Sequence, residues 1–134
     1  MINVESEIFT FVQSAVKEKY PDLYMTGEYV HAPSQFPCAT LIEMDNVPLV
    51  WTQTTDCSEN HASLMYEINV YSNKRSGRKT ECRKIAAEMD NALTKLGFVR
   101  TMLNPIPNLE DATVYRITGR YRAIISVGKI IYRR

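Results

Sequence analysis

The octapeptide LMYEINVY, residues 64–71, alternates between apolar and mixed side chains in the manner of a β-strand. Successive side chains of a strand point to opposite sides of its sheet. The side that we expect to be buried carries Leu64, Tyr66, Ile68 and Val70, whereas the other side carries Met65, Glu67, Asn69 and Tyr71. This alternation predicts a sheet with one face in the core and a second face of mixed character.

Helices are predicted before and after this strand, over Val4–Lys19 and Thr80–Leu96, because apolar residues recur there at spacings of three and four. Pro21 ends the first helix, and Gly97 stands where a left-handed C-cap is expected for the second. The predicted apolar stripes comprise Val4, Ile8, Phe11, Val12, Ala15 and Val16 in the first helix, and Cys82, Ile85, Ala86, Met89, Leu93 and Leu96 in the second.

Further extended segments complete the sheet. They are predicted at Tyr24–Ala32, Cys38–Met44 with an extension over Val47–Trp51, Phe98–Leu103 and Thr113–Val127. Asp45-Asn46 supplies a turn, Thr52–Ala62 reads as a loop, and the prolines of Asn104–Asn108 cannot continue a central strand. Lys129–Arg134 is expected to pair at a sheet edge or to reach a neighbouring subunit. The sequence therefore predicts one α+β domain over residues 1–134, a mostly antiparallel sheet of about four to six strands packed with two helices.

The composition is that of an ordered globular domain, with 45% hydrophobic and 23% charged residues among 134. Lysine and arginine number 16 against 15 acidic residues, so no overall field favours nucleic acid or anionic lipid. The three cysteines, Cys38, Cys57 and Cys82, are an odd number without Cys-x-x-Cys spacing, which favours a reducing compartment. We expect neither a standard export signal nor a membrane span.

Metal or catalytic chemistry has little support. Asp56, Cys57, Glu59 and His61 lie close together in the predicted loop, and a small metal-dependent enzyme would use Asp56, Glu59 and His61. A closed zinc site needs four ligands, however, and the only other histidine is His31. A solvated loop is favoured, so we predict no metal, no cofactor and no enzymatic activity.

Arginines form two groups that are candidates for an interface. Arg75 and Arg78 belong to a basic run before and within the second helix, and charge runs usually just solubilise a surface. Arg116, Arg120 and Arg122 alternate along the last long strand, where Glu67 of a neighbouring strand is a possible partner. Another subunit could cover this row through arginine–carboxylate pairs. The full set of candidate interface residues is Arg116, Arg120, Arg122, Glu67, Asp56, Glu59, Arg75 and Arg78.

Several short segments carry a family resemblance when they are taken in order. They are YEINVYSNK (66–74), the helix 79–96 that leads into LGFVR (96–100), PNLED (107–111) and YRITGRY (115–121). Together with the order of helices and strands, they resemble the tail-terminator and head-to-tail joining proteins of long-tailed bacteriophages. The resemblance covers nearly the whole chain and includes no catalytic signature.

The resemblance implies a structural virion protein. Such proteins form a hexameric ring that caps the tail tube, stops its polymerisation and meets the head connector, and DNA only passes through the ring. It implies that 52–62 and 104–108 face the tube or the connector. It also implies a location at the virion neck, preceded by the bacterial cytoplasm, and a chain that can stay monomeric until it meets its partner.

Other functions remain open from the sequence. A different neck component or a minor capsid protein would show the same elements. A small nucleic-acid-binding module would use the 74–84 cluster together with the strand arginines, and its binding would weaken steeply with salt.

Overall fold

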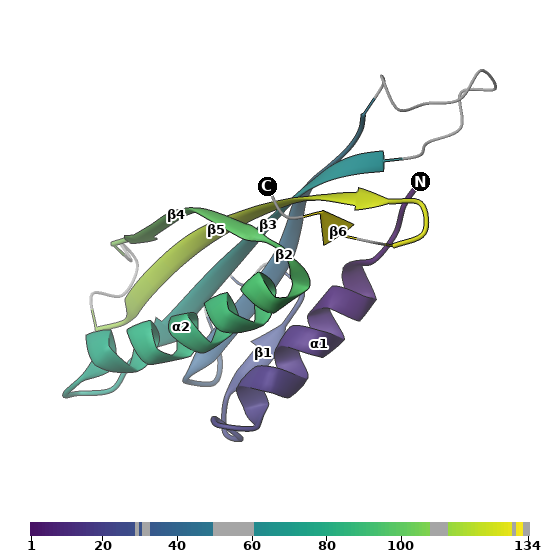
Figure 1. The fold of residues 1–134 in the computed structure, drawn as a ribbon. Helices are drawn as coiled ribbons and strands as arrows, with labels where there is room; N and C mark the ends of the chain where they lie inside the picture. Colours follow the sequence, from purple (N-terminus) through teal and green to yellow (C-terminus); the bar gives the residue numbers. More distant parts are fainter. Residues whose placement is uncertain (29, 31–32, 50–60, 108–112, 130, 133–134) are drawn as a thin grey trace, which may run out of the picture.

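The computed structural model describes residues 1–28, 30, 33–49, 61–107, 113–129 and 131–132. Within these residues, two helices and six strands follow one another (Figure 1). The helices are α1 (Glu5–Lys17) and α2 (Arg78–Leu96), and the strands are β1 (Tyr24–Thr26), β2 (Cys38–Pro48), β3 (His61–Ser72), β4 (Val99–Pro105), β5 (Tyr115–Ser126) and β6 (Ile131–Tyr132). The predicted α+β class is confirmed.

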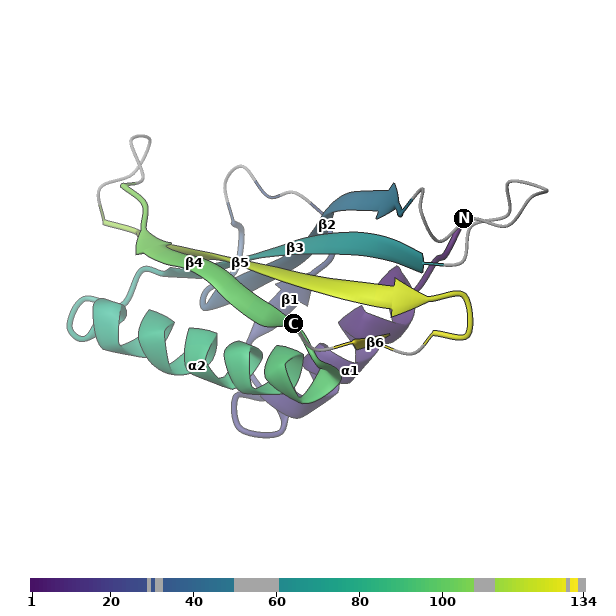
Figure 2. The same cartoon turned by 45° about the horizontal axis from the view of Figure 1, so that its top comes forward.

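The strands form one sheet with the order β1-β2-β3-β5-β4, and β6 pairs with β5 beside this path. β1 is parallel to β2, whereas all the other pairings are antiparallel. The pairing of β6 confirms that the end of the chain adds to the sheet. Both helices lie against the same face of the sheet (Figures 1 and 2), and no described helix covers the opposite face.

The two helices are positioned by their apolar stripes. Ile8, Val12 and Val16 of α1 are buried, and Gly97 closes α2 in the left-handed conformation with φ 104°, as predicted. The prediction was wrong for Phe11, which is 41% exposed, because the stripe of α1 that meets the sheet and α2 is narrower than the apolar run. Leu96 is only partly buried, and Ala92 takes a place in the core.

The core fills the layer between the helices and the sheet. The even-numbered side chains of β3 and the odd-numbered ones of β5 point into it, among them Tyr66, Ile68 and Tyr121, which are fully buried. Phe98 meets Tyr66 edge to face, with ring centroids 5.4 Å apart. Because a strand alternates, the odd side chains of β3 and the even ones of β5 necessarily project from the opposite face.

Three strand boundaries differ from the prediction. β1 has only three residues, and β2 runs through Asp45-Asn46, where we expected a turn. A register shift between Glu43 and Asp45 absorbs one extra residue there, so the strand bends instead of ending. β4 continues through Asn104 and Pro105, which is tolerated because β4 is an edge strand.

Most of the predicted loop 52–62 lies outside the described residues, and its last two residues belong to β3. Among the described helices, none is both long enough and apolar enough to cross a membrane.

Candidate interface on the uncovered sheet face

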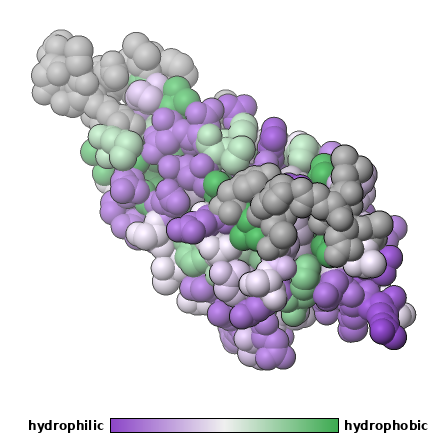
Figure 3. Space-filling model, turned by 180° about the vertical axis from the view of Figure 1, so that it is seen from behind, coloured by the Kyte–Doolittle hydropathy of each residue, from purple (hydrophilic) through white to green (hydrophobic). Residues whose placement is uncertain are grey.

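The face of the sheet that the helices leave free is called the open face below. Figure 3 shows the molecule from this side, where hydrophilic residues alternate with apolar patches. The pairing register places on it Thr40, Ile42, Asp45 and Val47 from β2, Ser63, Met65, Glu67, Asn69 and Tyr71 from β3, Arg116, Thr118, Arg120, Arg122 and Ile124 from β5, and Met102 from β4. The open face is therefore a mixed surface with a concentration of arginine on β5.

Asn69 is the centre of a polar network on this face. Its side-chain oxygen accepts hydrogen bonds from Arg116 Nε at 3.0 Å, from Arg116 Nη2 at 2.8 Å and from Thr118 Oγ1 at 2.7 Å. Its side-chain nitrogen donates to Glu67 Oε1 at 3.1 Å. Asn69 is only 1% exposed, so the amide is held by fully formed contacts and in turn fixes the direction of Arg116.

Glu67 holds the second arginine of the row. Arg120 Nε donates to Glu67 Oε2 at 3.1 Å, which confirms the predicted partnership between these residues. The Glu67 side chain is 8% exposed, whereas that of Arg120 is 45% exposed. A guanidinium group has five N–H donors, and this contact uses the one at Nε. Arg120 is thus anchored at Nε by a buried carboxylate, while nearly half of its side chain remains exposed.

Arg116 is further restrained by the ring of Tyr71, with the guanidinium carbon 5.6 Å from the ring centroid. The chain therefore fixes two arginines on this face: Arg120, which is exposed, and Arg116, which is half-buried. Fixed arginines suit recognition of carboxylates or phosphates, because little side-chain entropy remains to be lost on binding.

We expect Asn69→Ala to lower the free energy of unfolding by about 1–3 kcal/mol, because Thr118 Oγ1 would lose its acceptor in a buried position. Urea unfolding followed by circular dichroism measures this loss. Thr101→Ala is a suitable control, since its exposed hydroxyl donates to a backbone carbonyl at the edge strand. An unchanged unfolding midpoint for Asn69→Ala would show that the network does not support the fold.

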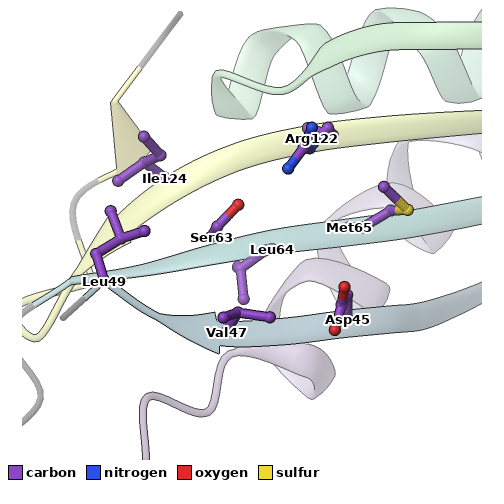
Figure 4. A pocket seen from close by; sticks show the side chains of 8 residues that line it. All are labelled: Asp45, Val47, Leu49, Ser63, Leu64, Met65, Arg122 and Ile124. Carbon is purple, nitrogen blue, oxygen red and sulfur yellow. The ribbon is translucent and has the colours of Figure 1, made fainter.

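Arg122 borders a groove farther along the open face. The groove has a volume of about 300 Å³ and is lined by Asp45, Val47, Leu49, Ser63, Leu64, Met65, Arg122 and Ile124 (Figure 4). β2, β3 and β5 supply the side chains of its floor, while Leu49 follows β2.

Within the part of the chain that the structure describes, Arg122 makes no ion pair. Arg116 likewise makes no ion pair among these residues, but it is held by Asn69 and Tyr71.

Arg75 and Arg78 are not brought to this surface. Arg75 is exposed and Arg78 is half-buried, and they lie in the turn before α2 and at its first residue. Asp56 and Glu59 lie outside the described residues. So do Cys57 and His31, which were considered above as metal ligands. His61 is the first residue of β3, and the described residues contain no group of metal-ligating side chains.

Cys38 and Cys82 are structural in the described core. Both thiols are free and buried, and Cys82 Sγ approaches the backbone oxygens of Val70 and Tyr115. Burial raises the pKa of Cys38 to about 11 and, together with the nearby Glu81, that of Cys82 to about 12. Thiolate, the reactive form, is therefore scarce at neutral pH.

We expect neither of these thiols to react with a chromogenic disulfide reagent at pH 8 while the protein is folded. A Cys57→Ser variant isolates them, and absorbance records the reaction before and after addition of denaturant. Rapid labelling of the folded variant would contradict the burial described above.

The sequence pointed to Arg116, Arg120 and Glu67 but not to Asn69 and Thr118, which complete the network. Asn69 and Thr118 are directly paired across β3 and β5. The signal in the sequence was that each of these two amphipathic strands carries a polar residue at the paired position. Recognising the pair required the register between the two strands, which lie far apart in the sequence.

A comparison of the chain with protein-family models and with curated proteins finds no match.

Proposed function

We propose that this chain is a structural protein of the neck of a long-tailed bacteriophage, where it caps the tail tube as a hexameric ring and joins the tail to the head connector. The observation that supports this proposal best is the open face, where Arg120 is anchored by the buried carboxylate of Glu67 and Arg116 by the buried amide of Asn69. On the proposed role, the protein works in the virion after assembly in the bacterial cytoplasm.

The chemistry of the open face favours a protein interface. Interface centres are enriched in arginine and aromatic residues and in methionine. The open face presents Arg120 held by Glu67 and Met65 beside Arg122, and Arg116 lies over the ring of Tyr71, which is itself buried. Such a surface offers hydrogen-bond donors for carboxylates together with apolar area. A second copy of this chain can supply both carboxylates and apolar side chains to it.

Ring formation also needs two different surfaces that meet head to tail. The chain has a helical layer on one side and the open face on the other, as well as the edge strands β1 and β4. These surfaces are chemically unlike one another, so contact between them generates a directional assembly of the sort that a ring around a tail tube requires.

The proposal is tested by the mass in solution of the purified protein, alone and mixed with candidate tail-tube proteins. Light scattering after size exclusion, at low and moderate salt, distinguishes a 15.4 kDa monomer from a hexamer. A hexamer in either sample supports the role. A chain that stays monomeric with every tube protein, yet binds DNA with a steep salt dependence, would favour a nucleic-acid-binding module.

Another neck component or a minor capsid protein is the nearest alternative. A terminator stops growth of the tube, so tube length in electron micrographs separates these roles. We expect added protein to shorten or cap tubes that polymerise from purified tube protein, whereas a component without terminating activity leaves their growth unchanged.

A further inference from the structure

One row of side chains on the open face carries opposite charges on the two sides of β3 (Figure 4). Met65 of β3 is paired with Asp45 of β2 on one side and with Arg122 of β5 on the other. Asp45 and Arg122 are exposed, and neither makes an ion pair within the described residues. Neighbouring strands lie about 4.8 Å apart, so the backbones that carry the acid and the base are equally far from β3.

The adjacent row is aliphatic at the same two positions. Ser63 of β3 is paired with Val47 of β2 and with Ile124 of β5. Val47 is 46% exposed, and the other two residues are partly exposed. The two rows are two residues apart along β3, a distance of about 7 Å, so they form one patch. In this patch each side chain on β2 has a chemically complementary side chain on β5, with β3 midway between them.

The patch is complementary to itself under one particular rotation. A half-turn about an axis that runs along β3, just above the open face, places β2 of one copy over β5 of the other. Asp45 then lies opposite Arg122 of the second copy, and Val47 lies opposite Ile124. Both contacts occur twice, because a two-fold interface uses the same patch on both copies. A half-turn about an axis across the strands would instead place Asp45 against Asp45, so the charges select the axis along β3.

We propose that two copies of this chain form a two-fold dimer through their open faces, with the axis along β3 above Met65 and Ser63. Sheets that pack face to face lie about 10 Å apart and cross at about 30°, so close contact is limited to the rows near the axis. The next row along β3 contains Glu67, which the axis brings towards its own copy. Its carboxylate is already paired with Arg120, and its side chain is only 8% exposed. The dimer therefore places no unpaired like charges against each other at its centre.

The dimer goes beyond the proposed ring. A two-fold contact is complete with two subunits, whereas a ring needs two different surfaces that meet head to tail. The dimer covers the open face, so it must separate before that face can contact a neighbour in a ring. The inference concerns the free chain and requires no phage partner.

Exchange of charges tests both the dimer and its axis. Sedimentation velocity over a concentration series measures association of the full chain. We expect the unmodified chain to dimerise, and Asp45→Arg and Arg122→Asp each to raise the dissociation constant about tenfold, because each places like charges opposite one another twice. An equimolar mixture of the two variants is expected to regain the original affinity as a heterodimer, since two arginines then face two aspartates. Asp22→Arg, an equal charge change at an exposed position outside the two rows, is the matched control for Asp45→Arg.

The mixture decides the outcome. A mixture that associates no better than the single variants would overturn the inference, and so would an unmodified chain that remains monomeric at every concentration. Equal weakening by Asp22→Arg would overturn it as well, because the effect would then come from net charge. Since these measurements need only this chain, their failure leaves the neck role to be tested separately with tube protein.

Chemical cross-linking provides a second test that does not depend on charge. Met65 lies next to the proposed axis, so a Met65→Cys variant in a Cys57→Ser background should link to its own copy. A separation of about 10 Å between the sheets is too long for a disulfide, but a short bismaleimide spans it. Cys38 and Cys82 are buried and do not compete. We expect a covalent homodimer on a gel, formed at least about tenfold faster than with Arg75→Cys, an exposed position away from the patch. Equal rates for the two variants would contradict the proposed axis.

Discussion

Replacement of Tyr121 by alanine is expected to lower the free energy of unfolding by about 3–5 kcal/mol. The side chain is fully buried in the centre of β5, and its hydroxyl donates to Asp90 Oδ1 at 2.7 Å. The substitution removes a large apolar volume between the sheet and α2 and leaves Asp90 without this donor. A loss of this size exceeds a third of the stability of many domains of this length.

Denaturant unfolding measures the loss, and Tyr121→Phe separates its two parts. The phenylalanine variant keeps the ring and removes only the hydroxyl, so we expect it to cost about 1 kcal/mol. Arg100 Nη1, which lies 3.2 Å from Asp90 Oδ1, remains available to stabilise the carboxylate. A cost below about 1 kcal/mol for Tyr121→Ala would contradict the packing described here.

Gly119→Ala is the other substitution with a large expected effect, a loss of about 1–3 kcal/mol. A Cβ at this position in β5 would lie 3.0 Å from Leu103 Cδ1, 3.2 Å from Ile68 Cγ1 and 3.3 Å from the backbone oxygen of Met102. The backbone oxygen belongs to the neighbouring strand and cannot move away without disturbing the pairing. The close approach of β4 and β3 to β5 therefore requires glycine here.

Gly27→Ala serves as the matched control for Gly119→Ala. Its added Cβ would meet its nearest neighbour, Phe9, at 3.5 Å, an ordinary contact distance. We expect its unfolding free energy to change by less than about 0.5 kcal/mol, as measured by the same urea titration. Equal stabilities of the two alanine variants would show that β5 has room for a side chain at position 119.

The sequence was sufficient for the elements whose pattern is local. The two-residue alternation of 64–71 predicted both faces of β3. Glu67 was expected to pair with the arginine row, and the structure shows that its partner in the row is Arg120. The left-handed Gly97 was likewise predictable from its position after the last apolar turn. Each of these conclusions depended on residues that are close together in the sequence or on one pair of neighbouring strands.

Features that depend on contacts between distant segments could not be predicted from the sequence. The bulge that carries β2 through Asp45-Asn46 is visible only against the register of β3, and it places Asp45 in the groove. The exposure of Phe11 depends on how α1 leans on α2 and the sheet. The same tertiary packing determines which residues of the arginine row are anchored and which, like Arg122, are left to a partner.

Oxidative footprinting of Met65 and Met102 most directly tests whether the open face is an interface between subunits. Both side chains lie on that face, and methionine oxidation by hydroxyl radicals followed by mass spectrometry reports their access to solvent. We expect oxidation of both residues to fall several-fold when the monomer assembles into the proposed ring. Equal oxidation rates in monomer and ring would contradict the proposal that another copy covers this face.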